Sequence, residues 1–150
     1  MGTYPSNIST LETFGSVRRA IQRLAVKKLK SLKLGTKQVI VLRLISKKGQ
    51  CSMTELAEAS DSDLAAVSRM IASLVKNNWL IRARDPHDGR QAVVKLGTKA
   101  KRRLPEIESV VDEIADVVLN TLTASEAASF RSILVKMEKE LAQIESFDAM

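Results

Sequence analysis

Residues 52–96 hold the sequence pattern that most restricts what this chain can fold into. A short segment of periodic apolar residues is followed by the polar run 60–63, a second periodic segment, and two β-prone runs around a polar loop. Apolar residues at helical spacing predict helices, and β-prone runs on either side of a loop with Pro and Gly predict a hairpin. Helix, turn, helix and hairpin in this order predict a winged helix-turn-helix lobe, which we place at residues 33–97.

The helix that follows the polar run 60–63 is expected to begin near Asp63 and to end at Asn77 and Asn78. Asn suits this position because it tolerates the left-handed backbone that ends helices. The residues expected to face the core are Leu64, Val67, Ile71, Leu74 and Val75. The other sides carry small residues around one or two long polar ones, which suits a helix entering the major groove of DNA, about 12 Å wide. The candidate DNA-binding residues of this helix and of the turn before it are Ser62, Asp63, Ala65, Ala66, Ser68, Arg69, Ser73 and Lys76.

The expected hairpin joins strands at 79–84 and 92–96 through the loop 85–91, which is longer than a minimal hairpin requires. Arg84 and Arg90 flank this loop or lie on it, so the loop can reach the phosphate backbone or the minor groove. The candidate DNA-binding residues of this wing are Arg84, His87, Asp88, Arg90 and Gln91.

Several of these side chains have a second interpretation. Ser68 and Arg69 either read bases or contact only phosphates, and Arg69 can instead form an ion pair with a wing aspartate such as Asp88. His87 lies beside Asp85 and Asp88, which together form a partial set of metal ligands. Because no second His or Cys is nearby, we favour a solvated wing residue or a phosphate contact and predict no metal site.

The remaining segments are expected to be mostly helical. Ser9, Ser52 and Thr123 are each followed three residues later by Glu, the capping-box pattern that predicts a helix start. Thr36 is expected to cap a further helix, which Gly49 ends by adopting a left-handed backbone conformation. The core residues expected from that helix are Val39, Ile40, Leu42, Leu44 and Ile45.

Long apolar stripes lie outside the winged-helix lobe, on the helices expected within 8–32 and 98–147. One small lobe cannot cover these stripes, so we predict that they form a helical dimerisation lobe with a second copy of the chain. A two-fold dimer also places two recognition helices about one DNA turn apart, roughly 34 Å. The candidate dimerisation residues are Leu11, Phe14, Val17, Ile133, Leu134, Met137 and Leu141.

The distribution of charge favours a polyanionic partner. The chain has a formal charge of +7 and a pI near 9.8. Residues 1–50 carry eleven basic residues against a single acidic one, whereas residues 104–150 carry ten acidic residues against three basic ones. The basic face can meet duplex DNA, RNA or an acidic protein, and the basic first helix can pair with the acidic last two within or between subunits.

Composition also excludes several classes of protein. The lone cysteine, Cys51, rules out an intramolecular disulfide; it is either a peroxide-sensing thiol or, as we favour, a small buried residue. Trp79 is expected in the strand core rather than as a platform for a stacked base.

No apolar run is long enough to cross a membrane, so we expect a cytoplasmic protein. No nucleophile with a plausible base, glycine-rich phosphate loop or clustered carboxylate pair is present, so neither catalysis nor a cofactor is expected.

Residues 37–99 resemble the MarR family of bacterial transcription regulators. The motifs that carry this resemblance are Gln38-Val39 with Leu42, residues 52–57 (SMTELA), residues 67–71 (VSRMI), Leu74, residues 80–82 (LIR), Asp85-Pro86, Asp88-x-Arg90 and Val94-x-Leu96. The resemblance implies one MarR-like domain over residues 1–150, an obligate homodimer and a palindromic operator. Members of the family often bind a small effector between the winged-helix lobe and the dimerisation helices. It also implies that Arg90 enters the minor groove.

Three positions depart from the family pattern. Asn78 stands where a Gly is usual, which the tolerance of Asn for the left-handed backbone accommodates. Gly97 delays the expected Thr to Thr98, and Ala100 replaces another common Gly, so these two positions bear on where the helix after the hairpin begins. The expected fold is mainly α with a small β-hairpin wing. The expected function is sequence-specific transcriptional regulation, with the chain acting as a homodimeric repressor of duplex DNA that a small molecule can release. The alternative is a winged-helix module for protein interaction or RNA binding without operator specificity.

Overall fold

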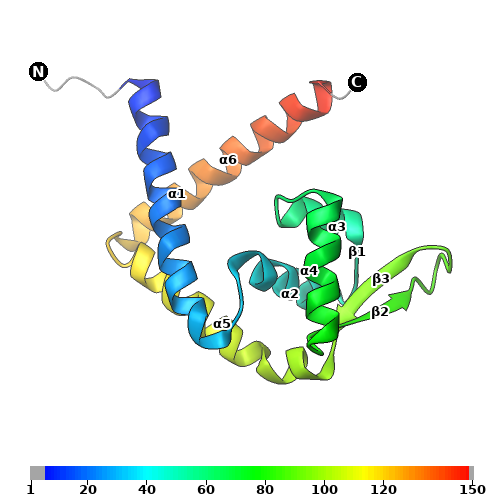
Figure 1. Cartoon of the computed structure of the whole chain (residues 1–150). Helices are drawn as coiled ribbons and strands as arrows, with labels where there is room; N and C mark the ends of the chain where they lie inside the picture. Colours follow the sequence, from blue (N-terminus) through cyan, green and yellow to red (C-terminus); the bar gives the residue numbers. More distant parts are fainter. Residues whose placement is uncertain (1–5, 149–150) are drawn as a thin grey trace, which may run out of the picture. The chain divides into compact units, whose positions relative to one another are not determined.

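The computed structural model describes residues 6–148 and is mainly helical with one small sheet, as predicted (Figure 1). In chain order its elements are α1 (Asn7–Leu29), a 3-10 turn η1 (Lys30–Leu32), α2 (Thr36–Lys48), β1 (Cys51–Ser52), α3 (Met53–Ala59), α4 (Leu64–Lys76), β2 (Leu80–Arg84), β3 (Ala92–Leu96), α5 (Thr98–Leu119) and α6 (Ala124–Asp148). The chain divides into two compact units, with the boundary inside α5 after Ile114. Among the helices described, none is both long enough and apolar enough to span a membrane.

The sheet is antiparallel, with the strand order β1-β3-β2. β2 and β3 form the predicted hairpin, in which Leu80 pairs with Leu96 and Arg84 pairs with Ala92. β1 has only two residues and pairs with β3 through Cys51 opposite Val94. This third strand was not predicted, because two residues are too few to display an alternating pattern.

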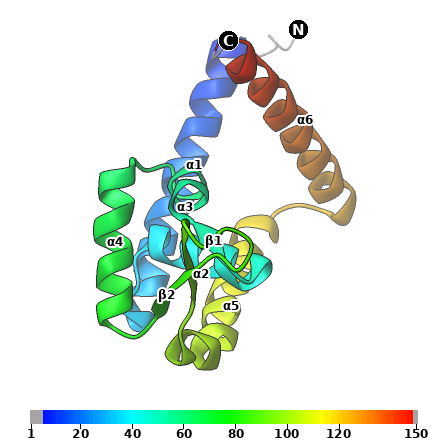
Figure 2. The ribbon, with the colours of Figure 1, turned by 90° about the vertical axis from the view of Figure 1, so that its right-hand side faces the viewer.

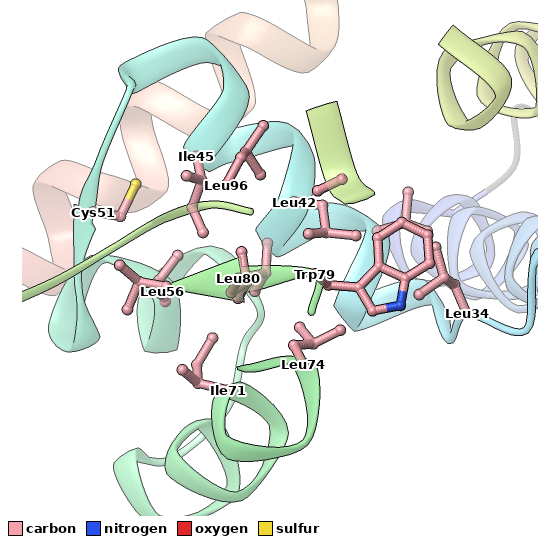
Figure 3. Close-up of a cluster of buried hydrophobic side chains, with 14 of the residues drawn as sticks. Leu34, Leu42, Ile45, Cys51, Leu56, Ile71, Leu74, Trp79, Leu80 and Leu96 are labelled. Carbon is pink, nitrogen blue, oxygen red and sulfur yellow. The ribbon is translucent and has the colours of Figure 1, made fainter. Parts of the chain in front are cut away.

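The core of the first unit lies where α2, α3 and α4 pack on the sheet, and Figure 3 shows part of this cluster. Its members in that view include Leu42, Ile45, Leu56, Ile71, Leu74, Trp79 and Leu80. The whole cluster draws residues from five α-helices, α1 to α5, and from all three strands, so these elements share one aliphatic interior with a single indole at its edge.

Two residues predicted to lie in this core are exposed. Ile40 is 43 % exposed, because successive helical residues are about 100° apart and Ile40 falls opposite the buried Val41, Leu42 and Ile45. Val41 was not among the residues predicted to lie in the core, but it is fully buried. Leu64 is 57 % exposed because it is the first residue of α4, and the core ends one turn further along the helix.

The predicted caps are correct at two helices and wrong at two others. At α3 the Ser52 amide donates to the Glu55 carboxylate at 2.7 Å and the Glu55 amide donates to the Ser52 hydroxyl at 3.2 Å. The same reciprocal pair joins Thr123 and Glu126 at α6, where the two amide bonds measure 2.8 and 3.2 Å. These capping boxes were predicted because they depend only on residues three positions apart.

The starts of α1 and α2 lie earlier than predicted. Ser6 caps α1, since its hydroxyl accepts from the Ser9 amide at 3.1 Å, and Ser9 is itself inside the helix. α2 is capped by Gly35, whose amide donates to the Gln38 side-chain oxygen at 2.9 Å, and Thr36 is the first helical residue. In both cases more than one polar residue precedes the apolar stripe, so spacing alone cannot select the cap.

The turn from α4 into β2 explains two departures from the family pattern. Asn78 has a φ of 62°, so it takes the left-handed conformation for which Gly is usual. Gly97 donates its amide to the Trp79 carbonyl at 2.8 Å, and a Cβ added at Gly97 would lie 2.8 Å from the Asn78 carbonyl oxygen. The close approach of these two backbones requires Gly at 97, and α5 then begins at Thr98.

Two ion pairs fasten α5 to the first two helices within the first unit. The Arg43 Nε donates to both carboxylate oxygens of Glu108, at 2.9 and 3.1 Å, and Lys28 pairs with Glu113. The expected pairing of the basic first helix with an acidic late helix is therefore present within this chain, between α1 and α5.

Candidate nucleic-acid interface

Helix α4 lies at the outer edge of the first unit (Figure 2), with one buried side and one exposed side. Val67, Ile71 and Leu74 are buried, as predicted. Of the residues predicted to face DNA from this helix, Ala65, Ser68, Arg69, Ser73 and Lys76 are exposed and Ala66 is half-buried. The exposed side consists of short side chains with Arg69 and Lys76 as its long cations, a shape that can enter a groove.

The turn before α4 holds the helix start in place. Asp63 caps α4 through its carboxylate, which accepts from the Ala66 amide at 2.7 Å. The Ser62 hydroxyl donates to the Ser60 carbonyl at 3.1 Å and accepts from the Lys37 ammonium at 2.9 Å. Two predicted DNA-binding residues, Ser62 and Asp63, therefore have structural roles in the free chain.

Lys37 makes structural contacts that were not predicted from the sequence. Its ammonium group donates to the Asp61 carbonyl at 2.9 Å as well as to the Ser62 hydroxyl, so it ties the start of α2 to the turn before α4. This contact joins residues more than twenty positions apart and depends on the fold. No local spacing rule could have found it.

The hairpin loop is ordered by its own side chains. Asp85 accepts from the His87 amide at 2.9 Å, Asp88 accepts from the Arg90 amide at 3.1 Å, and the Arg84 guanidinium donates to the Gly89 carbonyl at 3.0 Å. Backbone bonds between Asp85 and Gln91 and between Gln91 and Asp88 close the loop. All five predicted wing residues, Arg84, His87, Asp88, Arg90 and Gln91, are exposed.

The side chains of Arg69 and Arg90 have no ionic partner within residues 6–148. The alternative ion pair between Arg69 and Asp88 is thus not formed, and Asp88 is occupied by the Arg90 amide. Both guanidinium groups remain available to an anion from outside the chain. Arg84, in contrast, braces the loop on which Arg90 lies.

His87 and its acidic neighbours are exposed or half-buried on the loop. Throughout the part of the chain that the structure describes, no three His, Cys, Asp or Glu side chains are grouped to hold a metal ion. The Asp85 carboxylate is bonded to the His87 backbone amide, so these residues form a turn.

Trp79 is buried at the edge of the core, directly before β2, in agreement with the predicted core position. The Lys99 ammonium lies 4.8 Å and the Arg103 guanidinium 5.3 Å from the centre of the indole ring. Lys99 also donates to the Asn77 carbonyl at 3.3 Å. The indole and these two cations connect the end of α4 to the start of α5.

Cys51 is 1 % exposed and lies in β1, so the buried interpretation is confirmed. Burial raises the pKa of the Cys51 thiol, and the nearby Glu55 carboxylate raises it further. A raised pKa leaves little thiolate at neutral pH, which disfavours reaction with peroxide.

The residues predicted for dimerisation are on the surfaces of two helices. In α1, Leu11, Phe14 and Val17 are exposed. In α6, Ile133, Met137 and Leu141 are exposed and Leu134 is half-buried. Each helix therefore presents apolar side chains that nothing in its own unit covers.

Comparison with known proteins relates this geometry to a family. The sequence model of the MarR family matches residues 36–92, from the start of α2 to the start of β3. The HTH-type transcriptional regulator BilQ of Clostridium symbiosum is 30 % identical over 95 residues, which span 63 % of this chain and 66 % of BilQ, just under two thirds of its length. The chain therefore resembles the MarR family over its winged-helix lobe.

MarR-family similarity extends well beyond the matched segment. The multiple antibiotic resistance protein MarR of Escherichia coli is 29 % identical over 122 residues, which span 81 % of this chain and 85 % of that protein. A crystal structure of a mutant of the same MarR, complexed with operator DNA, matches with a TM-score of 0.74 at 28 % identity, covering 84 % of this chain and 91 % of that one. The MarR family comprises transcriptional regulators, and this chain has their winged-helix fold.

Proposed function

We propose that this MarR-like protein binds duplex DNA sequence-specifically as a homodimer and represses transcription by covering a promoter. The observation that carries the proposal is the exposed side of α4, with its short side chains and uncommitted Arg69, next to a hairpin bearing the uncommitted Arg90. The similarity to a MarR structure complexed with operator DNA supports the same assignment.

The proposed contacts divide into reading, anchoring and positioning roles. Ala65, Ala66, Ser68, Arg69 and Ser73 face base edges in the major groove, while Lys76 contacts the phosphate backbone. Arg90 enters the minor groove from the wing, with His87 and Gln91 beside it. Ser62, Asp63, Arg84 and Asp88 act chiefly by fixing the helix start and the loop, as their hydrogen bonds in the free chain indicate.

Homodimerisation is proposed because apolar surface on each unit needs a partner. Leu11 and Leu141 are each more than half exposed, and burying one such side chain is worth about 1.5–3 kcal/mol. An open apolar hollow of about 600 Å³ also lies within the second unit, between Leu119 and the first half of α6. A second copy would cover these surfaces, and its two-fold symmetry implies a palindromic operator.

Three further properties of the protein are proposed because they accompany a role as a transcriptional regulator. The protein acts in the cytoplasm, where bacterial promoters lie. It has no catalytic activity of its own. A small-molecule effector releases the dimer from its operator, as is common in the family.

The test is selection of bound sequences from random DNA duplexes with the full chain. We expect one recurrent palindrome, bound at least about 10³-fold more tightly than scrambled DNA and weakened steeply by added salt. Equal binding to selected and scrambled duplexes, or tighter binding to RNA of the same sequence, would instead support the alternative module without operator specificity.

A further inference from the structure

Leu64 is an apolar side chain at an unexpected place. It is the first residue of α4 and 57 % of it is exposed, whereas the other large apolar side chains of this helix are buried or half-buried. Leu64 and Ser68 are four residues apart, so they are neighbours on the same side of the helix. Leu64 therefore adjoins the exposed side of α4, where it is the only large aliphatic group.

The backbone under Leu64 is held firmly. Asp63 caps the helix immediately before it, and Lys37 ties the turn at Asp61 and Ser62 to α2. Side chains in a helix lean toward its N-terminus, so Leu64 projects beyond the first turn of α4. The fold therefore fixes where the Leu64 methyl groups lie relative to the other exposed side chains of α4.

The surroundings of Leu64 disfavour contact with the phosphate backbone. Leu64 lines an open hollow between α3 and α4, with Glu58, Asp61 and Asp63 among the other lining residues. Three carboxylates repel phosphate, and no basic residue lines this hollow. If α4 enters DNA as proposed, Leu64 meets base edges instead.

One apolar group is available on base edges in the major groove. It is the C5-methyl group of thymine, and apolar side chains discriminate thymine by contacting it. We propose that Leu64 is a specificity residue that packs against the C5-methyl group of one thymine in each half of the operator. This inference rests on the proposed function, because it requires α4 to occupy the major groove.

The test removes that methyl group and changes nothing else in the DNA. Each thymine of a selected duplex is replaced singly by deoxyuridine, and binding of the full chain is measured. At one thymine in each half-site we expect affinity to fall about fourfold, the effect of one buried methyl-sized group. Leu64→Ala should bind the thymine and deoxyuridine duplexes equally well.

The matched control is Ile81→Ala, which shortens another aliphatic side chain, 50 % exposed, on β2. This variant should keep the fourfold difference. Should Leu64→Ala fail to fold, Leu64→Met should keep the difference and Leu64→Gln should lose it, because only the former retains an apolar surface.

The outcomes separate this inference from the proposed function. A wild-type protein that selects an operator but is insensitive to deoxyuridine at every thymine overturns the role of Leu64 alone. The role is also overturned if Leu64→Ala, or Leu64→Gln in its place, retains the difference. A wild-type protein that selects no duplex at all contradicts the proposed function and, with it, this inference.

Discussion

Arg84 and Arg90 illustrate how two similar residues acquire different roles. Both flank the same loop, and the sequence assigned both to DNA. In the structure Arg84 donates to the Gly89 carbonyl at 3.0 Å, whereas the Arg90 guanidinium has no ionic partner within the described residues. Arg84 thus stabilises the loop, and Arg90 is free to bind.

Arg90→Ala is expected to weaken operator binding about tenfold and to make it less dependent on salt. Each cation removed from the bound DNA lowers the slope of log affinity against log salt by up to about 0.9, so a dimer loses up to about 1.8. Fluorescence anisotropy at several salt concentrations measures both quantities. Lys139→Ala, which removes an exposed cation from α6, should leave them nearly unchanged. Equal effects of the two variants would remove Arg90 from the interface.

Glu55 gives a prediction about pH at the same scale. The Lys48 ammonium and then the Ser52 amide lower the pKa of the Glu55 carboxyl, because both favour its charged form. A carboxyl whose pKa is lower in the folded state stabilises the fold at neutral pH, and this contribution is lost as pH falls through that pKa. A Gln at this position can still accept from the Ser52 amide but loses the charge that pairs with Lys48. Glu55→Gln should therefore cost about 0.5 kcal/mol of unfolding free energy at pH 7, within the range of exposed ion pairs, and much less near pH 3.

Urea unfolding at the two pH values measures this difference. Glu58→Gln is the matched control, since Glu58 is an exposed carboxylate of the same helix. A cost for Glu55→Gln that stays constant between the two pH values would show that its charge does not stabilise α3.

At the scale of elements, the contact between the α4–β2 turn and the β3–α5 junction positions the wing relative to α4. Gly97 and Asn78 make this contact, and the Gly97 amide donates to the Trp79 carbonyl. Because α4 and the hairpin are joined through this point, its geometry fixes the angle at which both can meet DNA.

Gly97→Ala should destabilise the protein by about 1–3 kcal/mol, the usual range for overpacking, because the new Cβ would lie 2.8 Å from a backbone oxygen that cannot rotate away. Gly89→Ala is the control, since nothing lies within 4 Å of the Cβ added there. Thermal unfolding of both variants tests the prediction. Similar melting temperatures for the two would show that the close approach is absent in solution.

The sequence predicted those elements whose signals are local. Capping boxes at Ser52 and Thr123, the hairpin and the buried side of α4 all depend on residues a few positions apart. Features that arise from packing between distant segments were missed or misplaced, including β1, the Lys37 contacts and the burial of Val41 in place of Ile40. Leu64 was misassigned because its spacing fits the core, although the core does not reach the first turn of α4.

At the scale of the whole molecule, the exposed side proposed to contact DNA and the apolar surfaces proposed to pair lie on different helices. The first unit carries the exposed side of α4 and the wing, and α1 and α6 carry uncovered apolar side chains. We propose that joining two copies through those side chains brings two reading surfaces onto one DNA site. A single copy would contact only half of a palindrome and would bind it weakly.

The measurement that tests this account most directly is the mass of the complex formed with a selected duplex, determined by light scattering in the presence of excess competitor DNA. We predict two chains on each duplex, and loss of the complex when either half of the palindrome is scrambled. One chain on each duplex, or a complex that is unaffected by scrambling, would contradict the proposal that this MarR-like protein reads its operator as a dimer.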